Sequence, residues 1–286
     1  MVSLHETHRK PQVYIYFGKR VVMFMIKKEK DGIVYFEFEH FNKTGLVNHC
    51  FSTRIGGRSV APYDSMNLAY HMGDAPDVVD QNFALMSAAV GFDADKIVMT
   101  DQIHENYHHV VYDDTKPEWV DGLITEVPGY TLASYYADCV PLLFLDPKAK
   151  VIANAHAGWR GTSFDMAGKT IQELYYEFGC EYKDILVGIG PAISGEHYEV
   201  GTDVVEQLLE YLPSADAHIT AVSEGKWHVD LVAINYHSML SMGIPAENIE
   251  VANLCTYSNP ELFFSHRRDG RERGNMAAMI MLRSEG

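Results

Sequence analysis

Three side chains of metal-ligand type, His104, Cys139 and His156, each stand where an apolar run ends. They occur in the strings QIH (102–104), YYADC (135–139) and NAHAGWRG (154–161). Two imidazoles and one thiolate make a good ligand set for zinc and leave a fourth position open for water or substrate. A structural zinc is usually held by four protein ligands, so three favour a catalytic zinc. Copper also binds such a set tightly.

Cys139 and His156 are expected to face each other from neighbouring strand ends. Cys139 follows the predicted strand Leu132–Tyr136, and His156 follows the predicted strand Val151–Ala155. Together with the adjacent Asp138, they are the candidate catalytic residues. The same pair also fits a metal-free hydrolase with a cysteine nucleophile and a histidine base. Taken singly, each residue also fits a packed core side chain, the commonest state of a buried cysteine.

The loop after His156, residues 157–161, has the composition of an anion site. Its glycines allow close approach of the backbone to a ligand, and a helix that follows offers free N–H groups. Arg160 adds a forked cation suited to phosphate. The alternative is a plain strand-to-helix turn with Trp159 packed in the core. Weaker polar strings add further candidates for substrate or phosphate binding: Arg54, Asn67, His71, Ser265 and His266.

The elements that must position these residues are short strands mixed with helices. Apolar runs predict strands at Ile97–Thr100, His109–Tyr112, Leu132–Tyr136, Leu142–Leu145, Val151–Ala155, Leu186–Ile189, Ile249–Ala252 and Ala277–Leu282. Helical periodicity predicts helices at Asp77–Val90, Thr162–Phe178, Val204–Leu212 and Asp230–Met242. Strands and helices do not alternate strictly, so we predict an α+β fold with mixed β-sheets flanked by helices in a single domain.

The N-terminal part predicts β-hairpins, with strands at Gln12–Phe17, Arg20–Lys27 and Ile33–Phe41 and a turn at Asp31-Gly32. We expect residues 1–47 to form N-terminal strands that are part of the core or appended to it. Residues 48–286 would then form the catalytic domain.

Composition limits the classes of protein that fit. The chain has 286 residues, of which 47% are hydrophobic and 22% charged, as in soluble globular domains. Its net charge of −16 argues against nucleic acid as a partner, because the phosphate backbone is also negative. No apolar run approaches the roughly 20 residues of a membrane span, so we expect no membrane anchor. The oligomeric state is left open.

The cysteines indicate a reducing compartment. Cys50, Cys139, Cys180 and Cys255 are far apart and form no CxxC motif, which argues against a zinc ribbon and against a disulfide framework. Reduced thiols are typical of cytosolic proteins. We therefore expect a cytoplasmic protein.

Eight short sequence motifs, taken in their order along the chain, resemble those of the YfiH-like family. They are STRIGG, SMNLAYHMGD, QIH, ADCVPLL, HAGWRG, GIGPAI, HYEVG and FFSHRRD, and the resemblance runs from about Asn48 to Ala278. Members of this family were first labelled multicopper polyphenol oxidoreductases, or laccases, and later recognised as purine nucleoside phosphorylases. The sequence departs from the family's QVHG string at Glu105, which puts a carboxylate next to His104.

The resemblance implies a single α+β domain with two β-sheets and a catalytic zinc whose ligands match His104, Cys139 and His156. It implies phosphorolysis of adenosine, inosine and 5′-methylthioadenosine to free base and ribose 1-phosphate, together with adenosine deamination. The substrates would be purine nucleosides and phosphate. A copper-dependent oxidase of phenols is the alternative, but the chain has no His-x-His pair of the kind expected where several coppers cluster.

Overall fold

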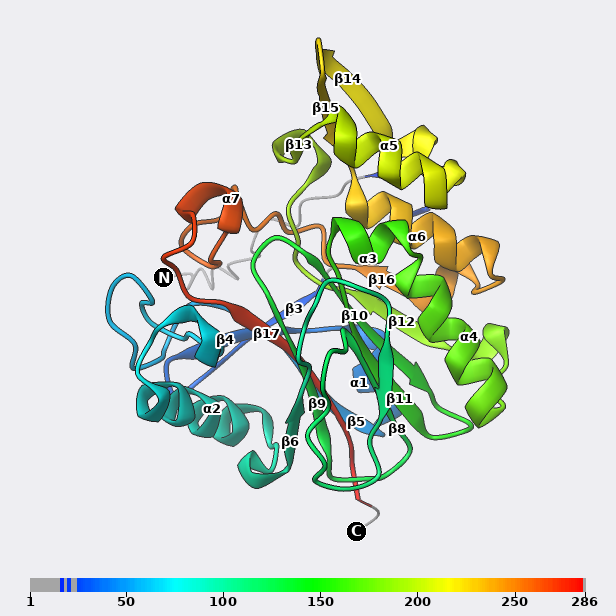
Figure 1. Cartoon of the computed structure of the whole chain (residues 1–286). Helices are drawn as coiled ribbons and strands as arrows, with labels where there is room; N and C mark the ends of the chain where they lie inside the picture. Colours follow the sequence, from blue (N-terminus) through cyan, green and yellow to red (C-terminus); the bar gives the residue numbers. More distant parts are fainter. Residues whose placement is uncertain (1–15, 18–19, 22–24, 285–286) are drawn as a thin grey trace, which may run out of the picture.

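Two six-stranded β-sheets form the centre of the fold (Figure 1). The computed structural model describes residues 16–17, 20–21 and 25–284. In spatial order, the first sheet contains β3 (Ile26–Lys30), β4 (Ile33–Glu37), β5 (Val47–Ser52), β17 (Met276–Leu282), β9 (Thr131–Tyr136) and β6 (Ile97–Met99). The second contains β16 (Ile249–Val251), β12 (Leu186–Ile189), β10 (Val140–Asp146), β11 (Val151–Ala157), β8 (Gly122–Thr125) and β7 (His108–Val110).

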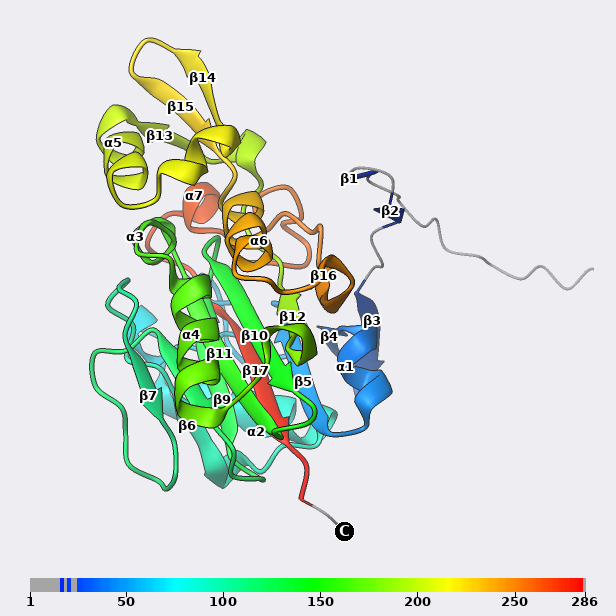
Figure 2. The same cartoon turned by 90° about the vertical axis from the view of Figure 1, so that its right-hand side faces the viewer.

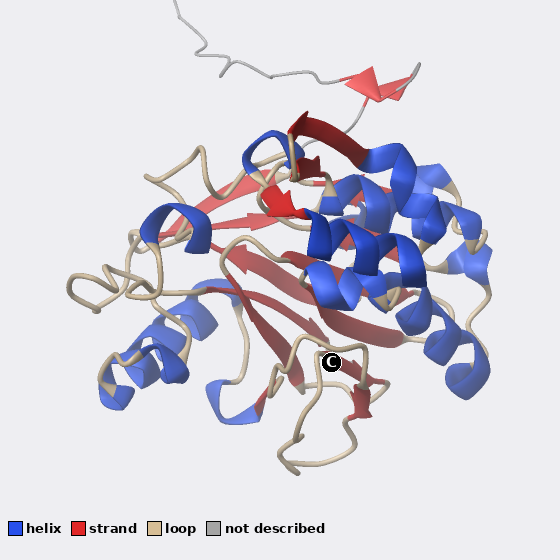
Figure 3. Ribbon diagram, turned by 45° about the horizontal axis from the view of Figure 1, so that its top comes forward, coloured by secondary structure: helices blue, strands red, loops and turns tan. Residues whose placement is uncertain are grey.

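Both sheets are mixed, and helices lie outside them (Figure 3). The pairs β6–β9, β7–β8 and β12–β16 are parallel, and the other pairs in these sheets are antiparallel. The α-helices are α1 (Glu39–Thr44), α2 (Pro76–Val90), α3 (Trp159–Ser163), α4 (Met166–Phe178), α5 (Thr202–Tyr211), α6 (Leu231–Ser241) and α7 (His266–Asp269). A small sheet contains β13 (Glu199–Gly201), β15 (Lys226–Val229) and β14 (Ile219–Ser223), and β1 (Tyr16–Phe17) pairs with β2 (Arg20–Val21). Short 3-10 helices cover Tyr70–Met72, Ala94–Lys96, Tyr182–Asp184, Gly195–His197, Pro213–His218 and Ala246–Asn248.

The inner faces of the two sheets pack on each other. Leu143 and Ile152 of the second sheet share one buried cluster with Leu132 and Ile280 of the first. The buried amide of Asn154 also joins the sheets, because its Nδ2 donates to the Leu132 and Ala278 carbonyl oxygens at 3.0 and 2.7 Å. The sandwich is therefore held by apolar packing and by one interior hydrogen-bonded bridge.

Helices bury the outer faces. Ile171 and Leu174 of α4 pack in the same cluster as Val187 of the second sheet, and Figure 2 shows α4 lying alongside β11. On the other side, Phe83 and Met86 of α2 pack with buried side chains of the first sheet. The central strands are therefore buried on both faces, which is why most of their residues are apolar.

The predicted α+β fold with mixed sheets is confirmed. β12 has the predicted bounds Leu186–Ile189, and α2 differs from its prediction by one residue. The Asp31-Gly32 turn joins β3 to β4 with positive φ angles of 53° and 79°, as a tight hairpin requires. β3 and β4 continue the first sheet beside β5. The strand predictions Gln12–Phe17 and Arg20–Lys27 lie partly outside the described residues. Within them, Arg20–Lys27 is not one strand, because Met25 separates β2 from β3.

Two element predictions were wrong. The predicted strand Ile33–Phe41 ends at Glu37, and α1 follows. The predicted helix Thr162–Phe178 is two helices, because Asp165 takes a φ of 54° and its side chain caps α4 by accepting from the Gly168 N–H. None of the described helices is long and apolar enough to cross a membrane.

Candidate metal centre and active-site cavity

The three predicted metal ligands meet at one edge of the sandwich, where the chain passes between the sheets. His104 lies on the connection from β6 of the first sheet to β7 of the second, and Cys139 on the connection from β9 to β10. His156 lies within β11, directly opposite Pro141 of β10. The predicted proximity of Cys139 and His156 is thus found, with His156 inside its strand rather than after it.

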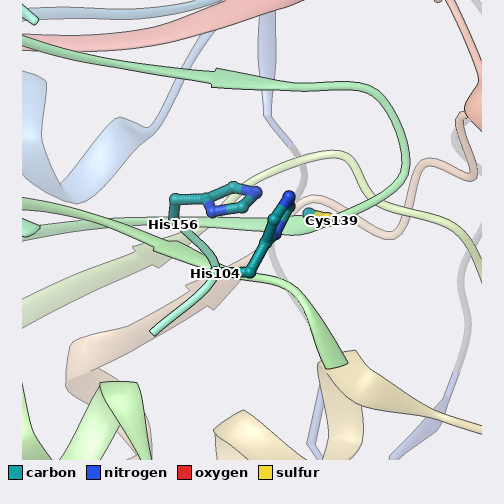
Figure 4. A group of neighbouring side chains, drawn as sticks. All are labelled: His104, Cys139 and His156. Carbon is teal, nitrogen blue, oxygen red and sulfur yellow. The ribbon is translucent and has the colours of Figure 1, made fainter. Parts of the chain in front are cut away.

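The ligand atoms of His104, Cys139 and His156 all lie within 4.8 Å of one another, and Figure 4 shows their side chains pointing into one space. His156 is buried, Cys139 is partly buried and His104 is exposed. Nδ1 of His156 is engaged with Asp121, which leaves Nε2 available as a ligand. Two imidazoles and a thiol at this spacing fit a zinc ion.

Gly158 makes room for this group. A Cβ atom at residue 158 would lie 3.1 Å from Sγ of Cys139 and 3.1 Å from Nδ1 of His104. The expectation that glycine after His156 permits close approach of the backbone is therefore met at this position.

Gly158→Ala is expected to weaken metal binding while leaving the protein folded, because the added methyl group displaces Cys139 and His104. We expect at least about a tenfold loss of zinc affinity, as for disturbed partners of metal ligands. Competition with a chromophoric chelator measures the affinity. Gly179→Ala is the control. Residue 179 ends α4 and does not line the cavity; its φ of 68° strains an added methyl group locally, but no atoms lie within 4 Å of its Cβ position. This variant should keep its zinc affinity, and equal affinity in both variants would contradict the steric argument.

Cys139 and His156 form a charged pair. Burial raises the pKa of the Cys139 thiol, but the His156 and His104 imidazoles outweigh burial and lower it to about 6. Burial lowers the pKa of His156, whereas the Cys139 thiolate and the Asp121 carboxylate raise it well above its ordinary value. Near neutral pH the metal-free site therefore holds a thiolate beside an imidazolium.

Asp121, which the sequence reasoning did not identify, holds both histidine ligands. Its Oδ1 lies 2.8 Å from Nδ1 of His156, and its Oδ2 accepts from the N–H groups of Ile103 and Glu105 at 3.0 Å each. These two N–H groups flank His104, whose φ is 62°. Burial raises the pKa of Asp121, but the His156 bond and the two N–H groups lower it below its ordinary value. One ionised carboxylate thus fixes the orientation of two ligands.

Gln102 anchors the loop that carries His104. Its Oε1 accepts from the Tyr135 N–H at 2.7 Å and its Nε2 donates to the Tyr135 carbonyl at 2.9 Å. The side chain of Gln102 thus continues the hydrogen-bond pairing at the end of β9.

Glu105, the residue at which the sequence departs from the family's QVHG string, does not line the cavity beside the candidate metal ligands.

A cavity of about 770 Å³ opens over the three ligands. Four further predicted residues line it: Asp138, His71, Arg160 and His266. Such a volume is typical of sites for small organic ligands. Arg160 is exposed, and its guanidinium lies over the Trp159 ring at 4.7 Å. Trp159 packs against the core beneath α3.

Asp138 makes hydrogen bonds that fix the segment around α7. Its carboxylate accepts from Thr256 Oγ1 at 2.6 Å, Ser265 Oγ at 3.1 Å and the Arg267 N–H at 2.7 Å. Asp138 itself has a φ of 98°, so this carboxylate also stabilises the sharp turn before Cys139.

Arg54, Asn67 and Ser265 do not line the cavity. Arg54 donates from Nε to the Asp64 carbonyl at 3.0 Å and lies over the Phe264 ring at 4.6 Å. Asn67 is buried, and its Oδ1 accepts from the Asn275 N–H at 3.0 Å. Ser265 is buried and caps α7. These three side chains shape the loops around the cavity.

The sequence belongs to a known family. The family model described as multi-copper polyphenol oxidoreductase laccase matches residues 48–283, and the chain belongs to this family, as its resemblance to YfiH-like proteins predicts. The crystal structure of YlmD from Geobacillus stearothermophilus is similar with a TM-score of 0.84 and 33% identity, covering 90% of this chain and 98% of that one. The hypothetical protein YfiH of Bacillus licheniformis is similar with a TM-score of 0.84 and 32% identity, at 90% and 99% coverage.

Named relatives are similar over nearly their whole length. A purine nucleoside phosphorylase of Bacteroides thetaiotaomicron is 34% identical over 271 residues, which cover 91% of this chain and 99% of that protein. A purine nucleoside phosphorylase of Deinococcus radiodurans is 38% identical over 242 residues, at 84% and 91% coverage.

Proposed function

We propose that this protein is a zinc-dependent purine nucleoside phosphorylase that converts adenosine, inosine and 5′-methylthioadenosine to free base and ribose 1-phosphate. The observation that carries the proposal is the convergence of His104, Cys139 and His156. Their ligand atoms lie within 4.8 Å of one another, and the three residues line a cavity of about 770 Å³. Relatives named as purine nucleoside phosphorylases support the same reaction. The four free cysteines are consistent with the cytoplasmic location that we propose.

In the proposed reaction, phosphate attacks C1′ of the ribose and the purine leaves. His104, Cys139 and His156 would hold the zinc, which supplies a Lewis acid at the cavity wall. Asp121 keeps His156 turned so that Nε2 faces the cavity. Arg160, at the exposed rim, attracts the phosphate anion. We assign Asp138 a positioning role, because three donors already occupy its carboxylate.

Adenosine deamination is proposed as a second activity of the same cavity. Zinc-dependent deaminases attack C6 of adenine with water, so this reaction would need the same metal ligands but no phosphate. Turnover of adenosine to inosine in phosphate-free buffer is its signature.

A metal-free hydrolase is the second candidate, favoured by the lowered pKa of Cys139 next to His156. Metal content and thiol reactivity distinguish the hydrolase from the zinc-dependent phosphorylase.

A copper oxidase that binds several coppers would need several ligand groups. Among the described residues, His104, Cys139 and His156 make up the one group of three or more His, Cys, Asp and Glu side chains close enough to hold a metal.

The test of the proposed function is turnover with and without phosphate. Purified protein should contain about one zinc per chain and should release hypoxanthine from inosine only when phosphate is present, with ribose 1-phosphate as the second product. Base release at the same rate in a phosphate-free buffer would identify a hydrolase. Oxidation of phenols upon copper addition, with no nucleoside turnover, would identify an oxidase.

A further inference from the structure

An arginine and an asparagine from the turn before β17 line the cavity, and each has a buried polar atom without a hydrogen-bond partner in the described part of the chain. Nε of Arg273 and Oδ1 of Asn275 are buried and have no hydrogen-bond partner among the described residues. Asn275 is only 5% exposed. Buried polar atoms are nearly always paired, so two unpaired atoms on neighbouring residues that line the cavity indicate a place where a ligand supplies the partners.

The backbone holds these two side chains in place. Asn275 donates its N–H to Oδ1 of Asn67 at 3.0 Å and accepts at its carbonyl from the Leu68 N–H at 3.1 Å. Between them, Gly274 packs so closely that an added Cβ would lie 2.5 Å from the Phe264 ring. The segment is therefore fixed before any ligand arrives, as a binding subsite requires.

The guanidinium of Arg273 is short of partners. Its one hydrogen bond to the described residues runs from Nη1 to the Gly270 carbonyl at 3.0 Å. Burial lowers the pKa of Arg273, and the charges of Asp138 and Cys139 offset this only in part. Burial also lowers the pKa of His71 and of His266, and the charge of Arg273 lowers both further. Arg273 thus lines the cavity together with two histidines that its charge affects.

We propose that Arg273 and Asn275 form the ribose 1-phosphate subsite of the cavity, in which Arg273 binds the phosphate and Oδ1 of Asn275 accepts a ribose hydroxyl. His71 and His266 lie beside the phosphate. This assignment rests on the proposed phosphorolysis and names the residues that hold its second substrate and its sugar product.

The chemistry of phosphorolysis requires such a pairing. An oxygen of hydrogen phosphate forms a bond to C1′ while the C1′–N9 bond breaks, and the base leaves with that electron pair and receives the proton that hydrogen phosphate gives up. Phosphate and sugar hydroxyls must therefore lie side by side. The forked guanidinium group matches the oxygens of phosphate. A neutral amide oxygen next to it can accept a hydrogen bond from a ribose hydroxyl, and it repels the phosphate anion less than a carboxylate would.

Arg273 is better placed than Arg160 to bind phosphate. Arg160 is exposed and stacked on Trp159, and water screens exposed charges. Arg273 is partly buried, with an Nε that water does not reach. We therefore expect Arg160 to favour the approach of phosphate and Arg273 to determine its affinity.

Arg273→Ala in the zinc-loaded protein is expected to raise the KM for phosphate by about ten- to a hundredfold, as the loss of a charged hydrogen-bonding partner typically does. Arg273→Lys should recover part of the loss, because lysine keeps the charge but not the fork. Zinc content should stay at the wild-type level. Arg271→Ala, which removes an exposed cation two residues away that does not line the cavity, is the matched control and should leave the KM unchanged.

Asn275→Ala tests the sugar contact. It should lower kcat/KM for inosine by about tenfold, and the loss should disappear for either 2′-deoxyinosine or 3′-deoxyinosine, whichever lacks the bonded hydroxyl. An equal loss for all three nucleosides would overturn the assignment of Asn275. An unchanged phosphate KM in folded, zinc-loaded Arg273→Ala protein would overturn that of Arg273.

Calorimetric binding of ribose 1-phosphate to the zinc-loaded protein separates this proposal from the proposed function. If the wild-type protein binds ribose 1-phosphate and the Arg273→Ala variant binds it at least about tenfold more weakly, the subsite stands even where no phosphorolysis is observed. If the wild-type protein catalyses phosphorolysis and both proteins bind ribose 1-phosphate equally, the function stands and the subsite is wrong. No binding by wild-type protein also overturns the subsite.

Discussion

Cys139→Ala is expected to remove zinc and phosphorolysis together. The change deletes the thiolate ligand, so only His104 and His156 remain. Without its thiolate partner, His156 still bonds to Asp121. Loss of a residue that merely supports a metal ligand costs about 10- to 100-fold in affinity or activity, so loss of the ligand itself should exceed about a hundredfold. Zinc is measured by elemental analysis and turnover by release of hypoxanthine.

Cys255→Ala is the matched control for this change. Cys255 is a free, partly buried thiol that does not line the cavity, so its removal should spare zinc content and turnover. Full zinc in the Cys139→Ala variant would contradict the ligand assignment. Wild-type protein that contains no zinc, and whose Cys139 is alkylated rapidly at neutral pH, would favour the hydrolase.

Asp121→Asn is expected to have the second largest effect, because one side chain serves both histidine ligands. The amide has one acceptor oxygen, whereas the carboxylate uses one oxygen for His156 and the other for two N–H groups next to His104. In either orientation of the amide, its NH₂ group faces a hydrogen-bond donor, either Nδ1 of His156 or the N–H groups of Ile103 and Glu105. We expect zinc affinity to fall about 10- to 100-fold, as measured by competition with a chelator.

The same substitution should lower the free energy of unfolding of the metal-free protein. The folded-state pKa of Asp121 is lowered, so its stabilising effect is complete above the unfolded-state pKa of about 3.9 and is lost as pH falls through the lower, folded-state value. The stability difference from wild type should therefore persist at pH 7 and shrink in strong acid. For zinc affinity, Asp113→Asn, at an exposed site earlier on the same connection, is the control; equal zinc affinity in all three proteins would refute the role of Asp121.

The strands β9, β10, β11 and β12 were predictable because each is covered on both faces and is largely apolar. The central strands β5 and β8 were not predicted, because β5 carries Asn48 and His49 and β8 is only four residues long and begins with Gly122.

The break between α3 and α4 was not predictable, because residues 162–166 contain neither a glycine nor a proline to mark the end of a helix. What fixes Asp165 is distant in sequence: it accepts a hydrogen bond from Ser238 of α6. A local pattern does not contain that contact.

The group of candidate metal ligands was identifiable because the residue types alone indicate chemistry, and the structure brings the three side chains together. Asp121 was not, because an aspartate before a glycine is also typical of a turn, and its partners lie 16 to 35 residues away. Arg54 and Ser265 illustrate the converse case. Both residues stand in polar stretches like those of the cavity-lining residues, but their side chains make hydrogen bonds to neighbouring loops. Only the three-dimensional structure distinguishes a polar side chain that stabilises a loop from one that faces a ligand.

If zinc binds here as proposed, the charged pair of Cys139 and His156 couples its uptake to the release of a proton. Zinc binds thiolate and neutral imidazole. In the metal-free protein the thiolate is already formed near neutral pH, since the pKa of Cys139 is about 6, while the raised pKa of His156 keeps that ring protonated. The proton released on zinc binding therefore comes from His156 rather than from the thiol. Zinc affinity should rise roughly tenfold per pH unit up to the pKa of His156, above which the ring is already neutral. Asp121 raises that pKa through its bond to the ring. Asp121 would therefore help to set the pH at which the protein binds zinc.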